Sequence, residues 1–79
     1  MNEDQEVNLM KDLKNQKPLT RDEVTYLNGM IEHHQMALVM AKDVLKVSRD
    51  NDIMSLSFAI LQTQMNEIAL MKQMLKERS

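Results

Sequence analysis

The chain has 79 residues, a formal net charge of −2, one Gly, one Pro and no Cys. Its length limits it to a single domain with little surface to bury, and the lack of a basic surplus argues against nucleic-acid binding. The lack of cysteine excludes disulfides and thiolate metal sites, and the scarcity of turn residues favours long helices over sheet.

Hydrophobic residues make up 43% of the chain, but one Phe, one Tyr and no Trp predict a core of aliphatic side chains and methionine. The longest uncharged run, residues 53–66, is too short to span a bilayer and contains several polar residues, so we expect no membrane insertion. Residues 1–6 are acidic and polar, and we recognise no signal peptide there.

Residues 1–17 are compatible with a short amphipathic helix or with an arm. Val7, Met10 and Leu13 fall at a three-residue spacing that gives about two turns of helix an apolar face. Their Asn, Asp, Lys and Gln neighbours suit an arm equally, so both alternatives stay open.

The first long helix is predicted over residues 20–47. Thr20 and Glu23 have the spacing of a capping box, in which each side chain bonds to the backbone N–H of the other. His34 lies near the middle of the apolar face, and His33 lies at its edge because neighbouring helical residues point about 100° apart. The predicted inner face comprises Leu27, Met30, Ile31, His34, Ala37, Leu38, Ala41, Val44 and Leu45.

A polar link at residues 48–52 offers several candidates for a helix N-cap, and the second long helix is predicted over residues 52–77. Its inner face also has one polar residue near the middle, Gln64, with Glu67 and Met74 at the flank. The predicted inner face comprises Ile53, Ser57, Ile60, Leu61, Gln64, Ile68, Met71 and Leu75.

Two helices of similar length with a short link predict an antiparallel hairpin. Folding the chain about residue 49 or 50 places His34 level with Met65, between Gln64 and Glu67. Met30 then lies between Ile68 and Met71 on the facing helix. The polar residues in the two apolar faces are therefore expected to meet at one level.

This convergence of imidazole, thioether and carboxylate predicts a metal site for copper, with Cu(I) favoured and zinc possible. The predicted ligands are Met30, His33, His34, Glu67 and Met71. Gln64, like Glu67, is expected to act as a further ligand or to orient an imidazole from outside the metal's coordination sphere. Met36 and Met40 lie one turn apart and form either a weaker, more exposed soft-metal site or part of a helix–helix seam.

The alternative interpretation contains no metal. His34 and Gln64 would hydrogen-bond across the hairpin and set its register, because buried polar side chains need such partners. The methionines would then fill gaps in the core. The sequence has no Glu-x-x-His, H-E-x-x-H or phosphate-binding loop motif, so we expect a protein that is not an enzyme.

The same residues resemble a bacterial family of helical proteins, the domain-of-unknown-function family numbered 305. The resemblance covers about residues 23–76 and rests on a double motif, with a Met before His-His on one helix and a Gln-x-x-Glu-Ile segment on the next. The matching positions are Met30, His33, His34, Ala37, Met40, Ala41, Gln64, Glu67, Ile68, Met71 and Leu75.

The resemblance implies a ferritin-like four-helix bundle, a role in copper binding and copper tolerance, and a periplasmic or otherwise extracytoplasmic location. This chain has one motif set where many members have two, and it has no recognised export signal. Gln73 and Met74 stand where members often have an aromatic residue, and Met74 adds a thioether.

One hairpin covers only part of each apolar stripe, so we expect an obligate homodimer in which two hairpins complete the bundle. The residues expected on the uncovered flanks are Tyr26, Met36, Met40, Val47, Leu56, Leu70 and Met74.

Overall fold

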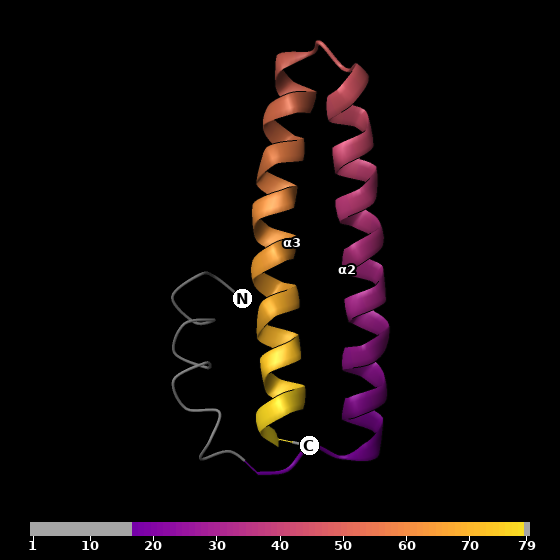
Figure 1. Cartoon of the computed structure of the whole chain (residues 1–79), viewed down its shortest axis with the longest axis vertical. Coiled ribbons are helices and arrows are strands. Elements are labelled where there is room, and N and C mark those ends of the chain that lie inside the picture. The colour runs from indigo at the N-terminus through magenta and orange to yellow at the C-terminus, as the bar shows by residue number, and fades with distance from the viewer. Residues whose placement is uncertain (1–16, 79) are drawn as a thin grey trace.

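The computed structural model describes residues 17–78, which form two long helices packed against each other side by side (Figure 1). Helix α2 runs from Arg21 to Val47 and helix α3 from Asn51 to Arg78, and no strand occurs in residues 17–78. The ends predicted at residues 20, 52 and 77 each differ from the observed ends by one residue. The alternatives for residues 1–17 lie outside the described part of the chain, apart from Lys17.

Helix α2 begins at the predicted capping box. The Glu23 backbone N–H donates to Thr20 Oγ1 at 3.1 Å, and the Thr20 backbone N–H donates to Glu23 Oε1 at 2.8 Å. These bonds satisfy two N–H groups that have no partner inside the helix. The box therefore sets where α2 starts.

The capping box also lowers the pKa of the Glu23 carboxyl. The main cause is the hydrogen bond from the Thr20 backbone N–H, followed by the Thr20 side chain and the Arg78 charge. A carboxyl whose pKa is lower in the folded state stabilises that state above its unfolded pKa, and the contribution disappears as the pH falls through the folded pKa. The capping box should therefore weaken in acid.

We expect Thr20→Ala to lower the free energy of unfolding by about 1 kcal/mol, because it removes an N-cap acceptor. The pKa of Glu23, measured by NMR titration, should rise toward its usual range in the same variant. Thr25→Ala is the control, because Thr25 is an exposed residue inside α2. Equal urea midpoints for the wild type and Thr20→Ala would contradict the assigned role of the cap.

The link between the helices consists of Ser48, Arg49 and Asp50. Ser48 ends α2 by donating its backbone N–H to the Val44 carbonyl at 2.8 Å. Asp50 starts α3, because its Oδ1 accepts the Ile53 N–H at 2.9 Å and its carbonyl accepts the Met54 N–H at 3.0 Å. Because the link is this short, the two helices lie antiparallel and adjacent.

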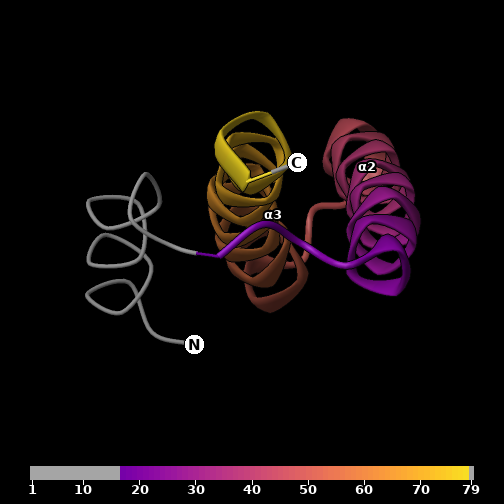
Figure 2. The same cartoon turned by 90° about the horizontal axis from the view of Figure 1, so that it is seen from below.

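The other end of the hairpin is also closed. The Leu19 backbone N–H donates to the Arg78 carbonyl at 2.7 Å, and Arg78 Nε donates to the Lys17 carbonyl at 3.0 Å. Figure 2 shows this segment passing beneath the end of α3 before α2 begins. One of the carbonyls left open at the end of α3 is thereby satisfied.

The main core cluster lies between the helices on the side of the molecule away from the link. Leu27 and Ile31 from α2 pack with Ile68 and Met71 from α3. The partly buried hydrophobic residues packed against this cluster are Leu19, Met30, Leu38, Met74 and Leu75. Toward the link, the buried residues are smaller, with Ala41 on α2 and Ser57 on α3.

Two side chains differ from the sequence-based assignment. Ile53 was expected on the inner face but is exposed, because it lies in the first turn of α3 beside the link. Leu70 was expected on an uncovered flank but is only 4% exposed. No helix among residues 17–78 is long and apolar enough to cross a membrane.

Candidate functional site

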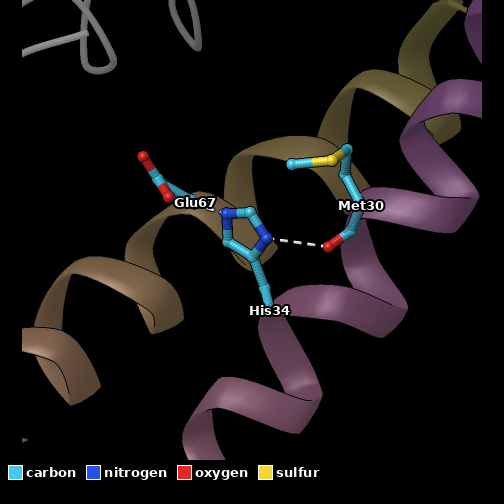
Figure 3. A network of polar contacts seen from close by, with 3 residues as sticks. All are labelled: Met30, His34 and Glu67. Atoms are coloured by element: carbon cyan, nitrogen blue, oxygen red, sulfur yellow. Dashed lines mark hydrogen bonds and ion pairs between the residues drawn. The ribbon is translucent and has the colours of Figure 1, made fainter.

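His34 lies at the edge of the core cluster, one turn along α2 from Ile31, and its ring is held by the helix itself. His34 Nδ1 lies 2.8 Å from the Met30 carbonyl oxygen, one turn earlier on α2 (Figure 3). A carbonyl can only accept, so Nδ1 carries the hydrogen and donates it. This bond fixes the orientation of the imidazole and leaves Nε2 pointing away from α2.

His34 Nε2 faces the neighbouring helix and lies 2.7 Å from Glu67 Oε1. Both ring nitrogens therefore face oxygen atoms, and a hydrogen bond between Nε2 and Oε1 requires one proton between them. The pair crosses from α2 to α3, as Figure 3 shows. A metal ion bound at Nε2 would take the place of that proton.

The site is partly exposed to solvent. The His34 side chain is 12% exposed and the Glu67 side chain 29%. The low exposure of the ring strengthens its interactions relative to those in water, while the greater exposure of the carboxylate leaves a route to solvent. A small ion could therefore reach the imidazole from the side on which Glu67 lies.

Met30 lies beside this pair, and Met71 belongs to the neighbouring core cluster. Met30 supplies the carbonyl that holds His34, and its thioether extends from α2 in the same direction as the ring, toward α3 (Figure 3). Met30 packs against the core cluster that contains Met71. The structure therefore brings together the His34 imidazole, the Glu67 carboxylate and the Met30 thioether, with Met71 one turn further along α3.

His33 stands apart from this group. It is exposed, and a neighbouring residue on a helix points about 100° away from His34. Met36 and Met40 are each 66% exposed and also lie away from the His34 ring. Gln64 is half-buried on α3, one turn before Glu67. Of the two histidines predicted as ligands, the structure places only His34 between the helices.

Glu67, and not Gln64, is the hydrogen-bond partner of His34. Folding the chain about residue 49 or 50 predicted that His34 lies level with Met65. Glu67 lies two residues further along α3, about 3 Å along the helix axis. A glutamate side chain spans that offset, and a carboxylate forms the stronger bond to an imidazole N–H. The predicted His34–Gln64 pair is therefore replaced by a His34–Glu67 pair.

Sequence reasoning also missed the Met30 carbonyl as a partner of His34. The four-residue spacing of Met30 and His34 is compatible with this bond, because a histidine ring on a helix can reach the carbonyl four residues earlier. Side-chain pattern alone does not reveal this bond, since every helical residue has such a carbonyl.

Comparison with known proteins gives one relative and one family. Over 57 residues the chain is 44% identical to "Uncharacterized protein L153" of Acanthamoeba polyphaga mimivirus. The aligned segment covers 72% of this chain and 38% of the viral protein. The chain thus matches well under half of the length of this viral relative. No solved structure matches the chain.

The family model described as "Domain of unknown function (DUF305)" matches residues 1–78. This match includes the His-His segment of α2 and the Glu67 segment of α3. The chain therefore belongs to the DUF305 family.

Proposed function

We propose that this protein is a non-enzymatic copper-binding protein that sequesters or delivers Cu(I). Its ligands would be the imidazole of His34 and the thioethers of Met30 and Met71. The observation that carries the proposal is the state of the His34 ring, which is anchored through Nδ1 so that Nε2 points across the hairpin. Histidines that bind metals are commonly held in this way, with the other ring nitrogen donating to a carbonyl.

The donor set favours Cu(I) over zinc. Cu(I) accepts thioether sulfur and neutral imidazole, and the core cluster includes Met71, with Met30 packed against it. Zinc sites in proteins usually have three or four Cys, His, Asp or Glu ligands. Residues 17–78 contain no group of three or more such side chains placed to hold one ion. Zinc is therefore the competitor to include in titrations.

Each residue has a distinct role in this proposal. His34 would supply the nitrogen ligand, and the Met30 carbonyl would hold the ring in place. Glu67 would bind the His34 proton when no metal is present and supply a carboxylate beside the ion when it is. Bound Cu(I) would supply a soft Lewis acid that the surrounding hydrophobic residues shield from water.

Competition between the wild-type protein and a Cu(I) chelator tests the proposal, with Zn(II) titrated in parallel. We expect Met71→Leu to lower the Cu(I) affinity about tenfold, because leucine keeps most of the core volume and removes the sulfur. Met65→Leu is the matched control, since Met65 is an exposed methionine on the same helix. Equal affinities for the wild type and Met71→Leu would remove Met71 from the site.

A second candidate function is that of a structural or protein-interaction bundle in which His34 and Glu67 only set the register. Every buried side-chain nitrogen and oxygen in residues 17–78 has a hydrogen-bond partner, which favours this candidate because the site is complete without a metal.

A double-mutant cycle addresses the structural candidate. We expect His34→Ala and Glu67→Ala to show a coupling free energy of about 1 kcal/mol in urea unfolding, because each change removes the partner of the other. The control cycle pairs His33→Ala with Glu67→Ala and should give no coupling. Coupling without any Cu(I) binding would favour the structural role, and additive effects would contradict it.

We further propose that the protein acts as a homodimer in which two hairpins form a four-helix bundle. Such a bundle would carry one His34 site on each hairpin. The small core of the single hairpin supports this dimer, because the main cluster of buried residues among residues 17–78 consists of Leu27, Ile31, Ile68 and Met71.

A further inference from the structure

One face of the hairpin is made of two rows of largely apolar side chains. On α2 the row has the three- and four-residue spacing of one helix side, and it contains His33, Met36, Met40, Val44 and Val47. On α3 the row has the same spacing and contains Ile53, Leu56, Ile60, Thr63, Glu67 and Met74, whereas Leu70, at the same spacing, is buried. Glu67 is the one formally charged residue in either row, and it is paired with His34.

A groove shows that the two rows belong to the same face. It lies between the helices toward the link and has a volume of about 330 Å³. Its walls are almost entirely apolar and come from both rows. The lining includes Ala37, Met40 and Val44 from α2 and Leu56, Ser57 and Ile60 from α3.

The opposite face is mixed in character, because on α3 it carries Phe58, which is 58% exposed, and Met65, which is 56% exposed. On α2 it has Gln35, Lys42 and Lys46, which the helical spacing places about half a turn away from the apolar row. Lys46 forms an exposed ion pair with Asp43 at 3.6 Å. Mixed charges of this kind suit a surface in contact with water. The two faces of the hairpin are therefore not equivalent.

The apolar face is large for a protein of this size. Val47 is 78% exposed and Leu56 57%, in addition to the two exposed methionines. The rows span residues 33–47 and 53–74, about 21 Å and about 32 Å along the helices, so a face two helices wide at about 10 Å each has an area of about 500 Å². Two such faces would bury about 1,000 Å² in total, which is at the lower end of the range for a specific protein interface. Exposed apolar surface of this extent marks an interaction site.

The shape of the face fits a second copy of the same chain. Met40 is 66% exposed and forms part of the groove wall, so a projecting side chain and a hollow lie next to each other on one surface. A twofold axis through such a surface places the ridge of each copy in the hollow of the other. Methionine is well suited to this because its flexible side chain fills irregular gaps.

The charge of the face also restricts the partner. The two rows contain neither Lys nor Arg, and their one carboxylate, Glu67, is paired with His34. An acidic or basic protein surface would find no complementary charge here. An identical face, whose single carboxylate is likewise paired with His34, leaves no charge unpaired.

We infer that this apolar face is the interface between two copies of the chain, with the Met40 side chain of each copy entering the groove of the other. This assigns Met40 and the groove residues to self-association and not to a metal site. The inference identifies the surface used by the proposed dimer and does not depend on metal binding.

Sedimentation equilibrium of the metal-free full chain is the first test. We expect a mass of twice 9.2 kDa for the wild type. Met40→Asp should raise the dissociation constant at least about 30-fold, because it places a charge at the centre of the interface. Val39→Asp is the matched control, since Val39 is 57% exposed but points away from the groove. It should leave the dissociation constant within about threefold.

Disulfide trapping provides a second test that needs no destabilising change. The chain has no cysteine of its own, so single-cysteine variants are unambiguous. A mixture of Met40→Cys and Leu56→Cys chains should form a disulfide-linked pair on mild oxidation, whereas Val39→Cys mixed with Leu56→Cys should not.

Three results would overturn the inference. The first is a wild-type monomer of 9.2 kDa with a melting temperature that does not change on dilution. The second is an equal dimer dissociation constant for Val39→Asp and Met40→Asp. The third is equal trapping from positions 39 and 40. Because all measurements use protein without metal, failure here is distinguishable from failure to bind Cu(I).

Discussion

Replacing His34 with glutamine is expected to lower the Cu(I) affinity by at least about tenfold, since loss of a metal ligand costs at least as much as loss of its supporting partner. Glutamine removes the imidazole nitrogen and keeps a side-chain N–H that can donate to Glu67. His33→Gln should change the affinity by no more than about threefold, because His33 is exposed and points away from the His34 site.

The measurement is competition with a Cu(I) chelator, with circular dichroism of each variant to confirm that it keeps its helices. The decisive comparison is between His33→Gln and His34→Gln, because the two variants have the same amino-acid composition and differ only in which imidazole is removed. Equal affinities for His34→Gln and the wild type would exclude His34 as a ligand. A larger effect at His33 than at His34 would place the copper site on the outer side of α2.

Replacing Ile31 with alanine is expected to lower the free energy of unfolding by about 3 kcal/mol, through lost burial and the cavity left behind. Ile31 is 8% exposed and belongs to the main core cluster, which consists of Leu27, Ile31, Ile68 and Met71. Such a loss is a large fraction of the stability of a small domain, so the variant should be largely unfolded under mild conditions.

Urea unfolding followed by circular dichroism provides the measurement, at several protein concentrations because dimer stability depends on concentration. Val39→Ala serves as the control, since it removes an aliphatic side chain from an exposed position on the same helix. A change below about 1 kcal/mol for Ile31→Ala would mean that the hairpin core contributes little to stability. The stabilising contacts would then have to lie elsewhere in the assembly.

The amino-acid sequence by itself determined where the helices begin and end. The capping box of Thr20 and Glu23 and the polar link before Asn51 are local signals, and the structure has both. Local signals are readable from sequence because each involves residues within one turn of one another. The two-helix, all-helical architecture followed from these signals and from the spacing of the apolar residues.

Sequence was less informative about how deeply individual side chains are buried. Helical spacing placed Leu27 and Ile31 in the core correctly, but it misplaced Ile53 and Leu70. The periodicity of a helix gives the direction of a side chain and says nothing of what lies opposite it. Exposure depends on that neighbour, and residues near the ends of a hairpin have fewer neighbours.

The level of the candidate site was also determined by the sequence, because a short link between helices of similar length brings residues 34 and 64–67 together. Only the tertiary structure decided which residues meet there. It paired His34 with Glu67 in place of Gln64, and it left His33 on the outer side of α2. The choice depends on an axial offset of about 3 Å and on the rotation of each helix about its axis, which are set by packing of the whole hairpin and not by any local motif.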